Sequence, residues 1–459
     1  MINRKVRKGF PQRALSHFLC VLCASFAPLR FKKNIMRPHI IITKLSLLLT
    51  IITIAGKEVI SQVYPEQYLQ QALENNPGLQ AQQKAREAAQ QQVDISGALP
   101  DPTLTAGFFT PPMERLMGTQ WFDVGVMQMF PWFGTLSKQK SVAEKMAESQ
   151  YHQYRDERNR LFMEMTRLWM EIYRKEQELN IIVRYKEILK DREDIIYTRY
   201  EAGQQGSGLT LDIYRLEIQL ADLENREEKL REEKNALLES FNILAGRELQ
   251  AAIETPDTLP QLSPAETETE PGREHFTSNP ALNRAEYAAE AAEIRQEASR
   301  LMTRPMLGVG LQYSYFAPGD AGMSQMDGGH MLMPMVSVSL PIFGRKNQAT
   351  RQQSGLLADA AQFRKDDIIN TLQTQWTQLK AKISNLQRDH EFYQRQLDIT
   401  QKTWELVINA YASGDEGFDE LLRIQDQLLD LEWRMLENQI NQNLARAEMD
   451  LLMARNIFE

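Results

Sequence analysis

The chain has 459 residues, of which 42% are hydrophobic and 25% charged, and its formal net charge is −8. Residues 1–61 hold 11 Lys and Arg and a single acid, Glu58, which leaves 42 basic and 60 acidic residues in the remainder. A body this acidic repels phosphate backbones, so the composition excludes a nucleic-acid-binding protein.

The first 61 residues are predicted to be a leader region. An apolar run at 40–55 is followed by small and β-branched residues, which is the order of a secretory signal. We place the cleavage point between Ser61 and Gln62 and expect Met36 to be the true start. A membrane anchor is the alternative interpretation.

Neither a disulfide nor a cysteine metal site is predicted after the leader. Both cysteines, Cys20 and Cys23, lie within it, and the remaining chain has none. No run of about 18 apolar residues occurs after position 62, so no transmembrane helix is predicted there.

The remaining chain reads as one unit repeated twice. Three segments of the first half resemble segments of the second, in the same order and at similar spacing: 74–90 with 278–294, 126–140 with 336–348, and 200–224 with 411–432. Internal similarity of this kind indicates duplicated structure. The predicted boundaries are a first repeat at 62–246, a Pro-rich acidic connector at 247–278 and a second repeat at 279–459.

Each half is predicted to contain one continuous helix and one broken helical column. Neither Pro nor Gly occurs between Gly134 and Gly203, which allows about 100 Å of helix at 1.5 Å per residue. A second such helix is expected at Arg345–Ser413. Shorter helices at Asn76–Leu99 and Leu209–Ala245, stacked end to end, would reach about 90 Å.

An apolar seam runs along the first long helix and is interrupted by Lys175 and Lys186. Its members recur at spacings of three, four or seven residues: Leu161, Met165, Leu168, Ile172, Leu179, Ile182 and Leu189. Such a seam predicts helices that pack side by side. On the helices alone, an extended coiled coil is the alternative.

Four short strands are predicted, two in each half. Leu307–Tyr315 and Val336–Leu340 alternate apolar or aromatic residues with small and polar ones. The first-half strands, Thr103–Phe109 and Trp121–Phe130, are less regular, and Gln128 falls on the apolar face. A soluble sandwich would bury that face, but the sequence offers no second sheet. Strands of about 9–11 residues instead match the height of a bilayer.

Four strands cannot close a barrel, and open strand edges are not tolerated in lipid. The subunits are therefore expected to pool their strands, with eight from two copies or twelve from three. Where a strand leads into a long helix, a Pro ends the ladder, aromatic residues suit the membrane interface and a Gly permits a sharp turn. These corner residues are Pro131, Phe133 and Gly134, then Pro341, Phe343 and Gly344.

In these features the chain resembles the outer-membrane efflux channels of the TolC type. The motifs are NPGL and NPAL, LPDP at Leu99–Pro102, the FPWFG and LPIFG corners, and two Gly-rich turns. LPDP with PWFG looks most like the CusC and CzcC branch, which serves heavy-metal efflux. The CusC kind often carries a lipidated N-terminal Cys, and none is available here.

The resemblance implies a mainly α fold with a membrane β-barrel. In a homotrimer, long antiparallel helices would form an α-barrel tunnel that extends into the periplasm. Four strands per subunit would be pooled into a 12-stranded barrel in outer-membrane lipid. A periplasmic adaptor (membrane fusion protein) and an inner-membrane pump of the RND type are the implied partners.

The resemblance also places the two Gly-rich turns at the periplasmic tip. The residues expected to contact the adaptor are Gly203, Leu209, Leu211, Gly414, Phe418 and Leu421. Asp419 aligns with an acidic ring of the family, so the expected periplasmic gate comprises Asp415, Glu416, Asp419 and Glu420. Candidate hydrogen-bond partners for these acids are Arg199, Arg215, Arg395 and Arg423.

No catalytic residues and no cofactor are predicted. The four histidines after the leader do not pair at metal-ligand spacing. The Gly-rich stretch Gly203–Gly208 lies between two predicted helices with no preceding strand, which argues against a nucleotide loop. We therefore expect a passive exit duct; a structural coiled-coil protein of the envelope and a peripheral enzyme are the alternatives.

Methionines concentrate in the two predicted hairpins. Thioether and imidazole ligands suit Cu(I) or Ag(I), so Met323, Met326, His330 and Met331 are candidate metal ligands. The alternative is that these methionines only pack well in strands and loops near lipid. Heavy-metal cations are the expected cargo, and organic compounds are the alternative.

Overall fold

The structure is a computed structural model that describes residues 66–115, 118–201, 207–256, 258–259, 276–318, 328–413 and 415–454. The predicted leader, the signal cleavage point and part of the predicted connector lie outside the described residues. All described residues belong to one compact unit, 62–459. None of the helices in the described part combines the length and the apolar character needed to cross a membrane.

Two long helices dominate the fold, as the sequence predicts. Helix α4 spans Thr135–Glu201 with 67 residues, and α7 spans Gly344–Ser413 with 70 residues. The second contains one interior glycine, Gly355, where an added Cβ would lie 3.1 Å from Gln296 Nε2. This glycine lets a neighbouring helix approach closely, which offsets its low helix propensity.

The shorter helices form the two broken columns. In the first half these are α3 (Pro77–Gly97) and α5 (Ser207–Ala245), with a short α2 (Glu66–Asn75) before them. In the second half they are α6 (Pro280–Met302) and α8 (Phe418–Leu452). Apart from α2, the element order is therefore the same in both halves: a helix, two strands, a long helix and a shorter helix.

The repeated Asn-Pro dipeptide is the joint of each broken column. Asn76 caps α3 because its Oδ1 accepts from Leu79 N at 3.1 Å, and its Nδ2 donates to Leu244 O, at the end of α5, at 3.2 Å. Asn279 does the same in the second half: Oδ1 accepts from Ala281 N at 2.9 Å, and Nδ2 donates to Leu452 O at 3.1 Å. One side chain thus satisfies two helix ends, which holds each column in line.

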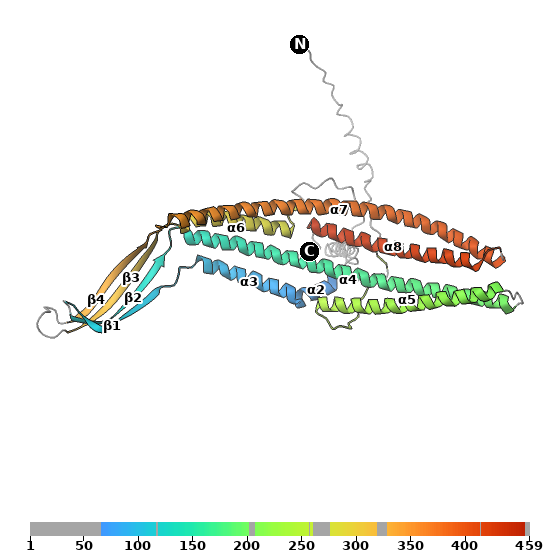
Figure 1. The fold of residues 1–459 in the computed structure, drawn as a ribbon, viewed down its shortest axis with the longest axis horizontal. Helices are drawn as coiled ribbons and strands as arrows, with labels where there is room; N and C mark the ends of the chain where they lie inside the picture. The colour runs from blue at the N-terminus through green and yellow to red at the C-terminus, as the bar shows by residue number, and fades with distance from the viewer. Residues whose placement is uncertain are drawn as a thin grey trace, which may run out of the picture. The chain divides into compact units, whose positions relative to one another are not determined.

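The helices lie side by side in a fixed order (Figure 1). Helix α4 packs against α3 and α5 on one side and against α6 and α8 on the other, and α7 packs against α6 and α8. The two outermost layers are therefore the α3–α5 column and α7. Each of these outer layers has a face that no other described helix covers.

The predicted seam of α4 is its buried face. Met165, Ile172 and Ile182 are at most 1% exposed, and Leu168 and Leu179 are partly buried. The two interrupting lysines pair with acids of α5: Lys175 Nζ lies 2.6 Å from a Glu233 carboxylate oxygen, and Lys186 Nζ 2.9 Å from Glu227. The interruptions therefore carry ion pairs between α4 and α5.

The strands form one antiparallel sheet in the order β1-β2-β3-β4. Their bounds are Thr103–Arg115, Gly118–Phe130, Met306–Ala317 and Gly329–Ser339. All four join the helices at the same end (Figure 1). Strands β1 and β4 contain prolines, Pro112 and Pro334 among them, and both lie at the edges of the sheet, where a missing N–H is tolerated.

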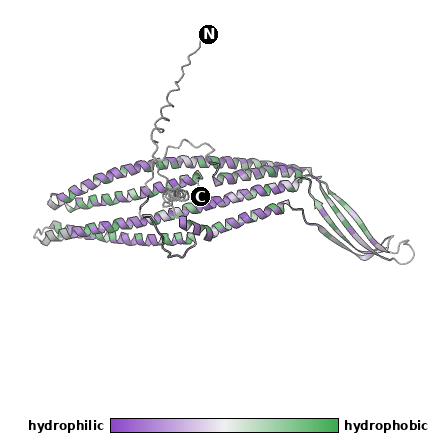
Figure 2. Cartoon of the chain, turned by 180° about the vertical axis from the view of Figure 1, so that it is seen from behind, coloured by the Kyte–Doolittle hydropathy of each residue, from purple (hydrophilic) through white to green (hydrophobic). Residues whose placement is uncertain are grey.

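One face of this sheet is apolar and exposed. Figure 2 shows hydrophobic residues along the strands. Phe108, Val309 and Val336 are 79%, 56% and 76% exposed. The outer strands β1 and β4 each pair on one side only. A single copy of the chain therefore leaves both a hydrophobic surface and two strand edges without a partner in the described part.

Candidate functional site

The helical end farthest from the sheet holds the predicted gate acids and the described members of the predicted adaptor contacts. Of the expected adaptor contacts, Gly203 and Gly414 lie outside the described residues. Leu209 is partly buried, and Leu211 is 48% exposed.

Two of the expected contacts are corrected by the structure. Phe418 and Leu421 are 1% and 0% exposed, and the Phe418 ring packs 5.7 Å from the Tyr411 ring of α7. The first turn of α8 directs both side chains into the core between α7, α8 and α4, so they stabilise the turn rather than offering apolar surface to a partner.

The four predicted gate acids lie in the same turn but have different surroundings. Asp415 accepts from Ser413 Oγ at 2.7 Å, and its backbone N–H donates to Ala410 O at 2.9 Å, which ends α7. Glu416 is exposed. The hydrogen bonds that Arg423 donates to Glu420 hold the pKa of that carboxyl below its ordinary value.

Asp419 connects the two halves of the duplication. Its Oδ2 lies 3.0 Å from Nη1 of Arg215, which also lies 3.5 Å from Asp212. Among the other predicted arginine partners, Arg423 pairs with Glu420, whereas Arg395 Nε donates to Glu391 O of its own helix. Arg199 falls where the side chains are not described.

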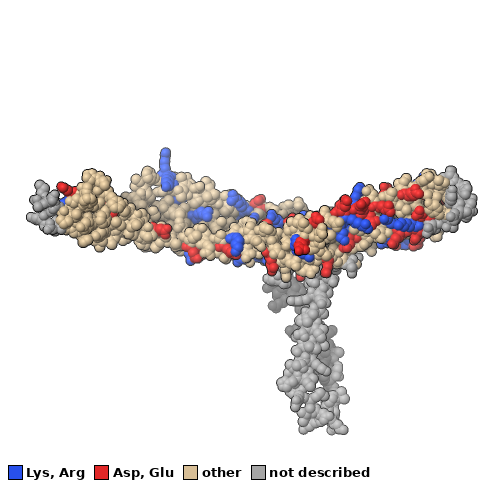
Figure 3. All heavy atoms as spheres, turned by 90° about the horizontal axis from the view of Figure 1, so that it is seen from below, with Lys and Arg blue, Asp and Glu red and all other residues tan. Residues whose placement is uncertain are grey.

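Further contacts continue this connection up α8 at seven-residue spacing. Gln219 Nε2 lies 3.5 Å from Asp426 Oδ2, and the Arg226 guanidinium lies 3.6 Å from the centre of the Trp433 ring. Arg184 of α4 pairs with Glu432. Burial raises the pKa of Asp426 and of Glu432. These contacts fasten α4 and α5 to α8 near the helical end farthest from the sheet. Figure 3 shows charged side chains gathered over this end, whereas the sheet end carries few.

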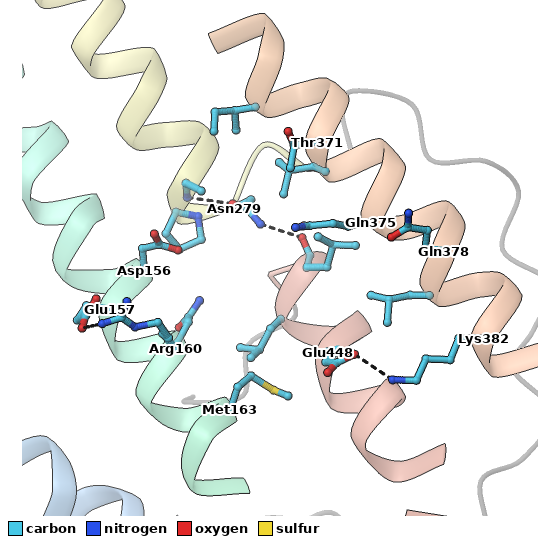
Figure 4. Close-up of a pocket in the computed structure, with 18 residues that line it drawn as sticks. Asp156, Glu157, Arg160, Met163, Asn279, Thr371, Gln375, Gln378, Lys382 and Glu448 are labelled. Carbon is cyan, nitrogen blue, oxygen red and sulfur yellow. Dashed lines mark hydrogen bonds and ion pairs between the residues drawn. The ribbon is translucent and has the colours of Figure 1, made fainter. Parts of the chain in front are cut away.

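A groove of about 700 Å³ lies where the second broken column is jointed, between α4, α6, α7 and α8 (Figure 4). Some of its polar groups are engaged with neighbouring groups. Asn279 bonds both helix ends, and Lys382 Nζ lies 3.5 Å from a Glu448 carboxylate oxygen. These are contacts that hold helices together, and they place no nucleophile beside a base.

The two strand-to-helix corners differ in what their glycines do. Gly134 has φ +81°, a backbone that favours glycine. Gly344 is the first residue of α7, has no positive φ and has nothing within 4 Å of an added Cβ. The prediction that a glycine permits a sharp turn has a backbone reason at Gly134, whereas the backbone at Gly344 would also accept a side chain. Pro131 directly follows the last residue of β2, whereas Pro341 lies two residues after the end of β4. Phe133 and Phe343 are 80% and 71% exposed.

The two predicted metal ligands that the structure describes, His330 and Met331, do not share a face of the sheet. Met323 and Met326 lie outside the described residues. His330 and Met331 are adjacent in β4, so their side chains point to opposite faces. His330 Nδ1 lies 2.6 Å from Tyr313 Oη, and the two rings stack on the apolar face. In the described part of the chain, no group of three or more His, Cys, Asp or Glu side chains could hold a metal ion.

The comparisons with known proteins identify the fold. No protein-family model matches the chain, and no curated protein matches it in sequence. Solved structures do match. A membrane protein from Pseudomonas aeruginosa has 18% identity and a TM-score of 0.70, over 86% of this chain and 90% of that one. CusC has 16% identity and a TM-score of 0.72, over 86% and 92%.

The outer membrane protein VceC of Vibrio cholerae is similar as well, with 14% identity and a TM-score of 0.70 over 84% of this chain and 95% of that one. The outer-membrane channels OprN, CmeC of Campylobacter jejuni and MtrE of Neisseria gonorrhoeae share the same architecture. The chain therefore has the fold of the TolC-type outer-membrane efflux channels, as the sequence resemblance implied. The similar structures are those of channel proteins and not of enzymes.

Proposed function

We propose that this chain is the passive exit duct of a tripartite efflux pump in the bacterial outer membrane, with a tunnel that extends into the periplasm. The observation that carries the proposal is the sheet. Its apolar face is exposed, and both of its edges are unpaired, in a chain with the fold of outer-membrane channels. Pooling strands between copies in lipid removes both features, because a closed barrel has no edge.

The outer helices support a homotrimer with the 12-stranded barrel. On α7, Phe392, Ile399 and Leu406 are 48%, 62% and 70% exposed at seven-residue spacing. On the opposite outer layer, Tyr214 and Ile218 of α5 are 58% and 62% exposed. The α7 stripe of one copy facing the α5 stripe of the next makes a head-to-tail interface, which closes into a ring.

The proposed partners are a periplasmic adaptor, docked at the tip, and an inner-membrane pump of the RND type. The proposed cargo is heavy-metal cations, and organic compounds are the alternative cargo. Similarity to CusC supports the first of the two. A structural coiled-coil protein of the envelope is the remaining alternative. It leaves the exposed apolar sheet face without a role.

Extraction with detergent from outer membranes, followed by sizing and planar-bilayer recording, tests the duct. The proposal expects a trimer with a discrete conductance. A monomeric or non-conducting protein would support the structural alternative.

A matched pair of variants tests the ring. The double variant Ile399→Asp with Leu406→Asp places two charges on the α7 stripe, and we expect it to yield monomers. The control, Gln394→Asp with Gln401→Asp, places two charges at exposed positions of the same helix, outside the stripe. Trimers that survive in the first variant would contradict the proposed interface.

A further inference from the structure

The polar face of the sheet carries a row of methionines. Register places Met127 and Met129 of β2 beside Gly310 and Gly308 of β3, and it places Met335 and Ser337 of β4 beside the same two glycines. Because β3 has no side chain at these positions, side chains from β2 and β4 can meet above it.

The sulfur atoms converge on one glycine. Ser337 Oγ lies 3.2 Å from Met127 Sδ and 3.7 Å from Met129 Sδ. An added Cβ at Gly308 would lie 2.6 Å from Met129 Sδ and 3.2 Å from Met127 Sδ. Two thioethers therefore share the space that a side chain at Gly308 would fill. The Met335 methyl lies near by, 3.8 Å from a Cβ added at Gly125.

These methionines lie outside the apolar cores of the protein. The same face carries Asp123, whose Oδ2 accepts from Gln312 Nε2 at 2.5 Å, and Thr105, whose hydroxyl donates to Gly125 O at 3.3 Å. None of the three methionines belongs to a hydrophobic core cluster of the described residues, and all three are partly exposed. The apolar side chains of the sheet lie on the opposite face. The three methionines share their face with the polar side chains.

We propose that Met127, Met129 and Met335 form a binding site for a soft monovalent cation, Cu(I) or Ag(I). Thioethers are neutral, polarisable donors that select such ions over Zn(II) or Co(II), which prefer imidazole, carboxylate or thiolate. Thioethers do not take up protons in the physiological range, so the site binds equally at pH 5 and pH 7, unlike a histidine site. Only the role as a transit point for cargo rests on the proposed duct function.

The test uses the full chain purified in detergent, with Ag(I) as the probe in chloride-free nitrate buffer. Metal retained after gel filtration is measured by mass spectrometry. We expect Ag(I) to bind equally at pH 5 and pH 7, with no competition from Zn(II). Binding should disappear in the variant Met127→Leu, Met129→Leu, Met335→Leu, because leucine keeps the volume and removes the sulfur.

The matched control removes three other methionines of the sheet, in the variant Met113→Leu, Met306→Leu, Met331→Leu, and should bind as the parent does. The variant Gly308→Ala keeps every sulfur but displaces them, and should lower Ag(I) affinity about tenfold. Binding that persists without Met127, Met129 and Met335, or that is lost equally in the control, overturns the site.

Bilayer recording on the same samples separates this proposal from the duct. A conducting trimer that binds no Ag(I) refutes the site and leaves the duct intact. A protein that binds Ag(I) through these sulfurs without conducting keeps the site and refutes the duct.

Discussion

Arg215 of α5 and Asp419 of α8 form an ion pair across the two halves of the duplication, with Nη1 3.0 Å from Oδ2. The Asp419 side chain is 69% exposed, so the pair contributes little to stability, about 0–1 kcal/mol. Its consequence is positional, because it holds α5 and α8 together at the tip.

Opposite changes at this pair should have opposite effects on ion selectivity. Removing the carboxylate in Asp419→Ala should lower cation selectivity and weaken block by trivalent ions, since fewer negative charges face the proposed aperture. Removing the cation in Arg215→Ala frees the carboxylate and should raise both the cation selectivity and the block by trivalent ions. Single-channel recording measures the two quantities. Unchanged selectivity in both variants would remove Asp419 from the proposed gate and make Asp415 or Glu416 the next candidate.

Asp426 is exposed as a residue, but its carboxyl is partly desolvated, and this should make stability depend on pH. Because burial raises its pKa above the ordinary value of 3.8, the folded state holds the proton more tightly than the unfolded state. The free-energy penalty is therefore present at pH 7 and fades as the pH falls through the raised pKa. Asp426→Asn should raise the melting temperature at pH 7 and leave it unchanged below about pH 4.

Asp430→Asn is the control for that experiment. Asp430 is exposed and pairs with Arg434 of its own helix at 2.8 Å, so its replacement should change the free energy of unfolding by less than about 0.5 kcal/mol at either pH. If Asp426→Asn raised the melting temperature equally at both pH values, desolvation of the carboxylate would not be the cause of the gain.

The joint of the second column should depend on the donor of Asn279. Asp is as good a helix cap as Asn, but Asn279→Asp cannot donate to Leu452 O and would place two acceptors together in a site that is 6% exposed. We expect a loss of about 1–3 kcal/mol in the free energy of unfolding. Asn76→Asp, at the more exposed joint, should lose less. Equal small losses of unfolding free energy in denaturant titrations of the two variants would contradict this role of the Asn279 donor.

The two corner glycines should respond differently to alanine. Gly134→Ala forces a side chain into a left-handed backbone and should destabilise the fold by about 1–2 kcal/mol. Gly344→Ala meets nothing within 4 Å and begins a helix, so it should be neutral or stabilising by up to about 1 kcal/mol. Thermal unfolding followed by circular dichroism compares the two. Equal losses would mean that the corners share one conformation.

Two residues near the tip, one buried and one exposed, should respond differently to substitution. Phe418→Ala removes a buried ring and should lower stability by about 3–5 kcal/mol. Leu211→Ser changes an exposed position and should leave stability within about 0.5 kcal/mol, while it weakens binding of the proposed adaptor. Pull-down with the adaptor checks the second effect. Adaptor binding that survives Leu211→Ser removes this residue from the contact surface.

The sequence by itself determined the helices, the duplication and most of the strands. The absence of Pro and Gly across α4, together with its three-, four- and seven-residue apolar spacing, is local information, and the seam predicted from Met165, Ile172 and Ile182 is the seam that is buried. The Asn-Pro repeat marked the starts of α3 and α6 because capping depends on neighbouring residues alone.

Only the tertiary structure decided which side chains meet. Phe418 and Leu421 could face a partner or a core, and the direction of the first turn of α8 buries them. His330 and Met331 were grouped because they are adjacent in sequence, whereas strand geometry places neighbours on opposite faces. Met127 and Ser337 lie 210 residues apart and meet because β2, β3 and β4 pair in one register and Gly308 leaves the space between them. Contacts between strands depend on that register, which no local pattern in this sequence encodes.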